Sequence, residues 1–227
     1  MTCFLQIVLF LIILLLAWIV FLLIAFRKEI DAIFDRDPAA RNSLEVVLLY
    51  SGLHAVVYHR LARALLKLRV PIVPRLVSQI ARFLTGIEIH PGAQIGPGLF
   101  IDHGMGVVIG ETTVIGKNVT LFQGVTLGGT GKEKGKRHPN IGDNVVIGTG
   151  AKVLGNITIG ANSYIGANAV VLRDVPPNAT VVGVPGRITK QEGRKIDLRL
   201  DHIHVLDPFK QALEEMEERI TKLEKRS

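Results

Sequence analysis

The sequence predicts a parallel β-helix that follows an α-helical region. A branched apolar residue recurs every six positions over much of residues 89–171, and glycine, asparagine or aspartate comes soon after many of these residues. A six-residue period fits neither an α-helix nor an ordinary strand pair, but it is typical of a solenoid with three short strands in each turn. Residues 28–84, in contrast, are rich in Ala, Leu, Arg and Lys and predict helices.

The N-terminal segment predicts a transmembrane helix. Residues 4–26 contain a single polar residue, Gln6. As a helix this run would be about 34 Å long, against about 30 Å for the hydrocarbon core of a bilayer. A cleaved signal peptide is the alternative, but no basic segment precedes the run and no short small-residue cleavage site follows it. We therefore expect residues 1–27 to anchor the chain in a membrane.

Charged residues beside this run predict its orientation. Arg27 and Lys28 follow it directly, and no Lys or Arg precedes it. Positively charged flanks stay in the cytoplasm, so the rest of the chain is expected there. Cys3, the only cysteine, lies at the membrane edge, which excludes a disulfide within the chain. It also excludes a thiol nucleophile or a cysteine zinc site elsewhere.

Part of the net charge of +7 is concentrated in residues 58–84, which contain no acid. Three interpretations are open: contact with anionic lipid headgroups, a solvated helix face, or docking onto the phosphates of an acidic ligand. A nucleic-acid partner is not expected, because neither aromatic interleaving nor a binding motif accompanies the charge. The six cations are Arg60, Arg63, Lys67, Arg69, Arg75 and Arg82.

Residues 28–86 predict an α-helical domain. Helical spacing of apolar residues is clear in "LEVVLLYSGLHAVVYHRLARALLKL". The two prolines of "VPIVP", residues 70–74, break this run, and a further helix over about 75–84 leads to Gly86.

Residues 87–190 predict the β-helix itself. The hexad residues should point inward and stack on their equivalents in the next coil, about 4.8 Å away. They are Ile89, Ile95, Ile101, Val107, Ile109, Ile115, Leu121, Leu127, Ile141, Ile147, Val153, Ile159, Ile165 and Val171.

Two irregularities interrupt the hexads. In "FIDHGMGVVIG", residues 100–110, the period slips by two residues just after His103. Between Leu127 and Ile141 the spacing is 14 instead of six, and the Gly- and Lys-rich extra residues predict an exposed loop. This loop is not a phosphate-binding P-loop, because Glu133 follows Lys132 where that motif needs Ser or Thr.

Residues 191–227 predict a helical tail. Apolar residues at spacings of three and four run from Leu206 to Leu223. This pattern fits either a short coiled coil, which would be trimeric, or a single amphipathic helix that packs on its own domain.

Several motifs resemble the serine O-acetyltransferases of bacterial cysteine synthesis, which are hexapeptide-repeat acyltransferases. The motifs are "RDPAA", "GLHAVVYHRLARAL", "IEIHPGAQIGPGLFIDHGMGVVIGETTVIG", "LFQGVTLGGTGK", "KRHPNIGDNVVIGTGAKVLGNI" and "VVGVPGRI", within about residues 30–190. The resemblance implies a left-handed β-helix and a homotrimer or a dimer of trimers. It also implies acetyl transfer from acetyl-CoA to the hydroxyl of L-serine, which gives O-acetylserine and CoA, and inhibition by L-cysteine.

His103 is the expected general base. The hydroxyl of serine is a poor nucleophile near pH 7, where imidazole titrates. The resemblance implies an acid 15 positions earlier, where this chain has Glu88 instead of the family's usual Asp. Asp102 is a weaker choice, because neighbouring side chains of an extended strand point to opposite faces. Since no usable cysteine is present, we expect direct transfer within a ternary complex.

The zwitterion serine needs an acid for its ammonium group and a cation for its carboxylate. By resemblance, Asp37 binds the ammonium group, Arg137 binds the carboxylate, and His138 is a second functional histidine. Purely structural roles remain open: Asp37 would cap a helix that begins at Pro38, and Arg137 would be a solvated loop charge.

The resemblance also implies where CoA binds. The pantetheine arm would lie in the groove between two prisms, under the loop that contains Gly129, Thr130, Gly131 and Lys132. Lys152 is expected either to contact a phosphate or to be a solubilising surface charge. No metal is expected.

Two features depart from the family. Members that dock onto O-acetylserine sulfhydrylase end in isoleucine, whereas this sequence ends in "LEKRS", which argues against that partner. A membrane anchor is also unusual in the family.

Three alternative functions are open. An acyltransferase for a sugar or antibiotic hydroxyl would lack "RDPA" and "KRHP", and a zinc carbonic anhydrase would need a histidine spacing that His90, His103 and His138 do not show. A non-catalytic membrane-anchored trimeric scaffold would cleave no thioester.

Overall fold

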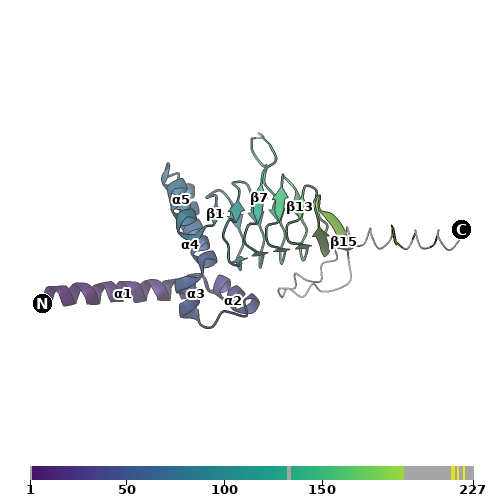
Figure 1. The fold of residues 1–227 in the computed structure, drawn as a ribbon. Coiled ribbons are helices and arrows are strands. Elements are labelled where there is room, and N and C mark those ends of the chain that lie inside the picture. The colour runs from purple at the N-terminus through teal and green to yellow at the C-terminus, as the bar shows by residue number, and fades with distance from the viewer. Residues whose placement is uncertain (1, 132–133, 192–215, 218, 220–221, 223–227) are drawn as a thin grey trace.

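The computed structural model describes residues 2–131, 134–191, 216–217, 219 and 222. Within these residues, helices come first and a prism of short strands follows (Figure 1). The predicted cofactor-loop residue Lys132 and most of the predicted tail helix lie outside the described residues. The helices are α1 (Thr2–Ala25), α2 (Arg27–Arg36), α3 (Ser43–Leu49), α4 (Ser51–Lys67) and α5 (Val73–Thr85).

Three sheets form the faces of the prism. Sheet A contains β1 (Glu88–Ile89), β4 (Val108–Ile109), β7 (Thr126–Gly128), β10 (Lys152–Leu154) and β13 (Val170–Val171). Sheet B contains β2 (Gln94–Ile95), β5 (Val114–Ile115), β8 (Asn140–Ile141) and β11 (Thr158–Ile159). Sheet C contains β3 (Phe100–Ile101), β6 (Thr120–Leu121), β9 (Val146–Ile147), β12 (Tyr164–Ile165), β14 (Ala179–Val182) and β15 (Arg187–Gln191).

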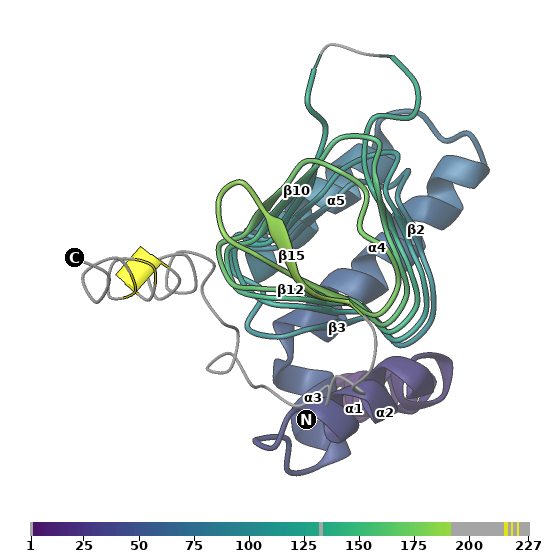
Figure 2. The same cartoon turned by 90° about the vertical axis from the view of Figure 1, so that its right-hand side faces the viewer.

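The chain visits sheets A, B and C in turn, so the prism is the predicted parallel β-helix. Neighbouring strands are parallel except β15, which pairs antiparallel with β14 in the last coil. Figure 2 looks along the prism from its C-terminal end and shows β10, β2 and β12 on different faces. The chain passes these faces clockwise while it advances toward the viewer, which is a left-handed coil.

The hexad residues fill the interior, as the sequence predicts. In sheet A, Ile89 pairs with Ile109, and Ile109 pairs with Leu127. All three are buried, and dispersion contacts between stacked side chains hold successive coils together. Val107 is also buried but is not a member of this stack, because Ile109 takes the position opposite Ile89. The two-residue slip therefore lengthens the corner before β4 and leaves the stack intact.

A ladder of asparagines follows the corner between sheets B and C. Each of these residues has a left-handed backbone, with φ between 54 and 59°, which asparagine tolerates better than most residues. The side-chain amides of the first three donate to the side-chain oxygen of the next asparagine, at 3.4, 3.0 and 3.2 Å along the prism. The four residues are Asn118, Asn144, Asn162 and Asn178.

Helices α4 and α5 cover the end of the prism at its first coil (Figures 1 and 2). Ser78 of α5 donates a hydrogen bond to the carbonyl of Ile89, at 2.7 Å. Arg60 and Arg63 of α4 donate to the carbonyls of Ile95 and Ala93, at 2.7 and 2.8 Å. Two of the six cations in residues 58–84 therefore fix the helices to the prism and are not solvated charges.

Among the described residues, helix α1 packs against the core near its C-terminal end, through Ile19, Leu22 and Leu23. Leu22 and Phe26 are buried in the main hydrophobic core, whereas most residues before Ile19 are exposed. By length and composition, Phe4–Ala25 can cross a membrane.

Candidate active site

Asp37, the predicted ligand of the substrate ammonium group, lies at the C-terminal end of α2. Its Oδ1 accepts a hydrogen bond from the backbone N–H of Ala39 at 2.8 Å, and its Oδ2 accepts one from the Tyr50 hydroxyl at 2.7 Å. Burial, with the Asp37 carboxylate as the next cause, raises the pKa of the Tyr50 phenol. Tyr50 therefore stays protonated and donates to Asp37, which keeps the carboxylate in one orientation.

His103, the predicted general base, occupies the lengthened corner between sheets C and A. Its φ is 55°, and Gly104 and Gly106 that follow have φ of 81 and 76°. A left-handed backbone at a histidine costs on the order of 1 kcal/mol and is often found where function needs it. The side chain of His103 is 75% exposed, so the imidazole projects away from the apolar interior.

A carboxylate contact to this imidazole comes from Asp102. The distance between His103 Nε2 and Asp102 Oδ1 is 4.0 Å. The sequence favours Glu88 over Asp102 as the partner of His103 if the backbone is extended, because neighbouring side chains of a strand face opposite sides. The left-handed φ of His103 removes that alternation and brings the two side chains together.

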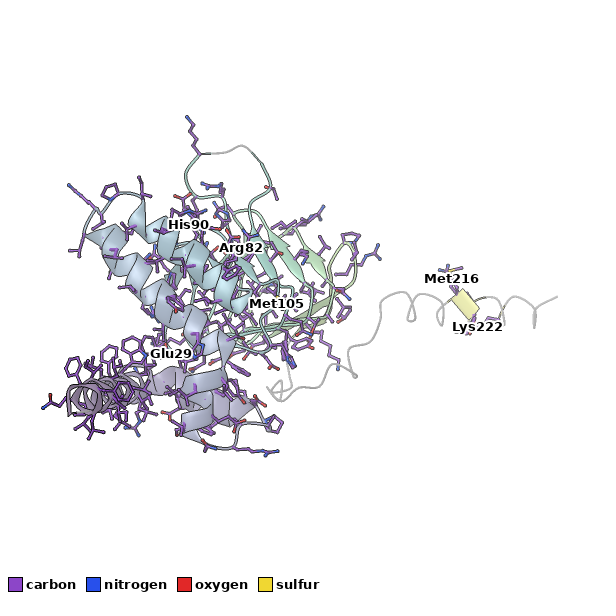
Figure 3. The ribbon with its side chains drawn as sticks, turned by 60° about the vertical axis from the view of Figure 1, so that its left-hand side comes forward. Glu29, Arg82, His90, Met105, Met216 and Lys222 are labelled. Atoms are coloured by element: carbon purple, nitrogen blue, oxygen red, sulfur yellow. The ribbon has the colours of Figure 1, made fainter. Side chains whose placement is uncertain are left out.

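Glu88 lies at the start of β1, next to α5. Its Oε2 is 3.4 Å from a guanidinium nitrogen of Arg82, and Figure 3 labels Arg82 on the side where α5 meets the prism. The expectation that Glu88 stands behind His103 differs from this arrangement, in which an ion pair directs the carboxylate toward α5. Among the described contacts, the carboxylate next to the His103 imidazole is therefore that of Asp102, and the Glu88 carboxylate pairs with Arg82.

Three residues that the motifs did not point to hold the helices against the prism, and one of them, Ser51, contacts the corner of His103. The guanidinium of Arg36 donates to Thr120 Oγ1 at 3.1 Å and holds the end of α2 against sheet C. Ser51 Oγ donates to the carbonyl of His103 at 3.2 Å. Gly52 lets α4 approach β3, since a Cβ there would stand 2.3 Å from a backbone oxygen of Ile101. For Ser51 and Gly52, the adjacent serine and glycine in "YSGLH" were the sequence feature that could have indicated a close contact between α4 and the prism.

Arg137, the predicted ligand of the substrate carboxylate, lies at the corner between sheets A and B. Its guanidinium is 2.5 Å from Glu111 Oε2. This hydrogen bond is the largest cause of a lowered pKa for the Glu111 carboxyl, which therefore stays ionised. The Glu111 carboxylate thus holds the Arg137 side chain in place. Arg137 is therefore not the freely solvated loop charge that the sequence alone left open.

His138 is buried and its polar contacts define its tautomer. Thr112 Oγ1 accepts from the backbone N–H groups of Arg137 and His138, so its own hydrogen is free to point to His138 Nδ1, at 2.9 Å. The backbone N–H of Thr112 also donates to Nδ1, at 3.2 Å. Burial lowers the pKa of His138, so the ring is neutral and carries its proton on Nε2. The glycine at position 110 makes room for this ring.

The predicted cofactor loop projects from the prism between β7 and β8 (Figures 1 and 2). Gly129 lies against the backbone of Arg137 at the base of the loop, and open space surrounds the Cα of Gly131. The side chain of Thr130 is close to Gly155 in the next coil. Lys152, on β10, donates to the carbonyl of Gly124, so its ammonium group points to the corner where the chain enters sheet A.

The two groups of predicted residues lie at opposite ends of the strands of sheet A. Asp102 and His103 are at the corner where the chain enters sheet A, and Arg137 and His138 are at the corner where it leaves. Asp37, after α2, belongs with the first group, because it binds Tyr50 and the adjacent Ser51 contacts His103. One chain therefore does not bring the general base to the predicted carboxylate ligand. Among the described residues, no three His, Cys, Asp or Glu side chains form a ligand set for a metal ion.

Comparison with known proteins identifies the family. Residues 138–173 match the family described as bacterial transferase hexapeptide (six repeats). A serine acetyltransferase of Staphylococcus xylosus is 60% identical over 196 residues, which are 86% of this chain and 91% of that protein. The chain belongs to the serine acetyltransferase family. It is therefore an acyltransferase of cysteine biosynthesis that transfers the acetyl group of acetyl-CoA to L-serine.

Solved structures of relatives agree in fold. The serine acetyltransferase of Neisseria gonorrhoeae in complex with serine has a TM-score of 0.72 and 42% identity, over 74% of this chain and 69% of that chain. The Brucella abortus enzyme in complex with coenzyme A has a TM-score of 0.72 and 45% identity, over 76% of this chain and 72% of that chain.

Proposed function

We propose that the acetyl transfer takes place between two copies of this chain in a homotrimer. His103 of one copy would act on a serine whose carboxylate is bound by Arg137 of the next copy. The observation that carries this proposal is the separation of the two groups across sheet A, because neither group alone can hold both ends of serine. A three-fold contact that sets the entry corner of one prism against the exit corner of another completes the site.

In this arrangement Asp37 binds the ammonium group of serine. Tyr50 and Ala39 leave lone pairs of the Asp37 carboxylate available, since each oxygen accepts one of the described bonds. Arg137 reaches the serine carboxylate with guanidinium hydrogens that Glu111 does not use. These two contacts direct the hydroxyl toward the imidazole of His103.

The reaction then needs one proton acceptor and one donor to the oxyanion. His103 takes the hydroxyl proton while the serine oxygen bonds to the thioester carbon. Asp102 stabilises the imidazolium that forms. The C–S bond breaks, and the imidazolium returns the proton to the CoA thiolate. The Nε2–H of His138 is a fixed neutral donor that can stabilise the oxyanion from the neighbouring copy.

The other predicted site residues lie near CoA or near His103 in this proposal. Gly129, Thr130 and Gly131 would cover the pantetheine arm, and Lys152 would lie beside it on sheet A. The role of Glu88 as the acid behind His103 requires its ion pair with Arg82 to open. The relative solved with coenzyme A supports a CoA site on this fold.

We also propose that α1 crosses a membrane and places the enzyme at its cytoplasmic surface. The exposed apolar length of α1 and the flanking Arg27 and Lys28 support this proposal. Extraction of cell membranes with alkaline carbonate should leave the full chain in the membrane pellet.

Mixing two inactive variants tests the shared site. His103→Asn and Arg137→Ala chains, each nearly inactive alone, are unfolded together and refolded as a mixture. Random trimers would place a native His103 opposite a native Arg137 at about a quarter of the interfaces. Serine-dependent CoA release should return to about that fraction of the native rate. A mixture as inactive as its parts would place the whole site in one copy.

A further inference from the structure

Helix α5 presents its large apolar residues to the outside of the protein. Toward the prism it buries small or polar residues, namely Pro74, Ser78, Ala81 and Thr85. A surface helix normally does the reverse, with its apolar stripe against the core. A continuous exposed apolar strip of this kind marks an interaction site. We call it the α5 outer stripe, and its members are Ile72, Val73, Leu76, Ile80, Phe83 and Leu84, which are 82, 39, 54, 45, 88 and 59% exposed.

The backbone before α5 supports a role for this stripe. Ile72 has a φ of 63°, in the left-handed region, where a β-branched side chain is a genuine outlier. Its side chain is nevertheless 82% exposed, so no buried contact of Ile72 offsets the strain. Backbone strain that no internal contact explains is most often found at functional positions.

The charges beside the stripe are all positive. Lys67, Arg69 and Arg75 are exposed around the turn between α4 and α5, and residues 58–84 contain no acid. The other cations of the segment are engaged, since Arg60 and Arg63 bind carbonyls of the prism and Arg82 pairs with Glu88. Within the part of the chain that the structure describes, Lys67, Arg69 and Arg75 form no ion pair, and an apolar strip beside such cations fits the interface of an anionic bilayer.

The position of α1 brings a bilayer to this stripe. The last turn of α1 is packed into the core through Leu22 and Phe26, and α2 begins at Arg27, so no linker separates the apolar helix from the domain. In Figure 1, α1 leaves the protein on the side that α5 occupies. In Figure 2, α1 is seen nearly end-on, so it runs roughly along the prism axis. A membrane crossed by α1 therefore faces the layer of α4 and α5.

A pocket at the base of α1 continues the basic surface. Its volume is about 550 Å³, and its lining includes Arg27, Lys28 and Arg60 with one acid, Glu29. Glu29 pairs with Arg60 at 3.5 Å and Arg27 is 3.7 Å from Asp31, an exposed pair, so Lys28 is the cation of this pocket that no described acid pairs with.

We propose that the α5 outer stripe lies in the headgroup region of an anionic bilayer, with Lys67 and Arg69 against lipid phosphates. The catalytic prism then rests on the membrane through α5 and does not hang from α1 alone. This inference rests on the proposed membrane span of α1. A second copy of the chain is disfavoured as the occupant. The three-fold contact proposed for catalysis is made by the corners at the two ends of sheet A, and a separate two-fold contact through the stripe would set these cations against their own equivalents, with no acid in residues 58–84 to pair with them.

Spin labels on the full chain test the proposal. In a Cys3→Ser background, a nitroxide is placed at Phe83→Cys, or, as the matched control, at Val184→Cys. Both positions are exposed and apolar, but Val184 follows β14 in the last coil. The protein is reconstituted in vesicles of phosphatidylcholine and phosphatidylglycerol. At Phe83 the ratio of collisions with lipid-soluble oxygen to collisions with a water-soluble nickel chelate should exceed the ratio at Val184 several-fold.

Each result has a definite meaning. Equal ratios at the two positions, or a Phe83 label shielded from both reagents and cross-linking between copies, would overturn the proposal. Failure of the protein to float with the vesicles would remove the membrane span on which it rests. In phosphatidylcholine alone the ratio at Phe83 should fall, and an unchanged ratio would overturn the role of Lys67 and Arg69. Serine-dependent CoA release, measured on the same vesicles, tests the catalytic proposal separately.

Discussion

Two histidines at the two ends of sheet A have opposite surroundings. His103 has a side chain that is 75% exposed, a left-handed backbone and one described carboxylate contact at 4.0 Å. His138 is 8% exposed, and Thr112 binds its Nδ1 through both a hydroxyl and a backbone N–H. The same repeating scaffold thus produces one accessible imidazole and one fixed imidazole.

The difference separates two chemical tasks. A general base must gain and lose a proton, which needs access to substrate and tolerance of a positive charge. An oxyanion donor must keep its proton and hold its position, which burial and a lowered pKa favour. The lengthened corner supplies the first environment and the corner with Gly110 supplies the second.

The largest effect is expected from replacing the accessible histidine. His103→Asn should lower the turnover number at least about 10²-fold, the usual scale for a general base. Asparagine tolerates the left-handed φ, so the corner is preserved, and the melting temperature should not change. Measured CoA release close to the native rate would exclude His103 as the base.

The acid that serves His103 should be the next most sensitive position. Asp102→Asn is expected to lower the turnover number about tenfold or more, because the imidazolium loses its nearby carboxylate. Glu88→Gln, the matched variant, should cost less, because the Glu88 carboxylate is directed to Arg82. If Glu88→Gln had the larger effect, the partner implied by the family resemblance would be the correct one.

The fixed histidine should affect stability as well as rate. His138→Ala leaves the partly buried N–H of Thr112 without its acceptor and should destabilise the protein by about 1 kcal/mol or more. His138→Asn places an oxygen near the Nδ1 position and should recover most of that stability without recovering the rate. Chemical denaturation and CoA release on both variants separate the two roles, and a fast His138→Asn enzyme would refute the donor role.

A third histidine extends the comparison to stability against pH. Burial lowers the pKa of His59 to about 4, from an ordinary value of 6.5, so the ring is neutral when folded. The unfolded chain binds a proton below about pH 6.5, so this contribution is present above that pH and is lost as pH falls toward 4. Between pH 7 and pH 5 the loss should be about 2 kcal/mol.

The variant His59→Gln should remove that part of the pH dependence, since glutamine keeps a donor for the carbonyl of Ala93 but does not titrate. Unfolding by urea at the two pH values measures the effect. An equal loss of stability in the variant and the native protein would assign the pH dependence to other groups.

The prism could be predicted closely because its signal is local and repeated. Each hexad residue, such as Ile109 or Leu127, has the same environment as its equivalents, so the period alone gives the strand and its inward face. The motifs singled out Asp37, Arg137 and His138 as candidates but did not give their places at element ends or corners. The slip near His103 marked the corner where the backbone turns left-handed.

The contacts within the site could not be predicted in the same way. The pairing of Glu88 with Arg82 depends on where α5 packs, and the contact of Asp102 with His103 depends on one backbone angle. The roles of Arg36 and Thr112 depend on partners more than 20 positions away in the sequence. The spacing of residues along the sequence does not reveal these contacts, because each forms where segments that are distant in the sequence pack together.

The asparagine ladder makes the prism modular. Asn144 and Asn162 present the same donor and acceptor to the coil on either side, so an added coil of the same kind would join the ladder without a mismatch. The residues assigned to serine lie in the helices and the first three coils, up to β8. Duplicating a coil beyond β12, past Lys152 on β10, would therefore lengthen the protein away from the membrane while the reaction site keeps its parts. Enzyme length and enzyme chemistry can change independently in this architecture.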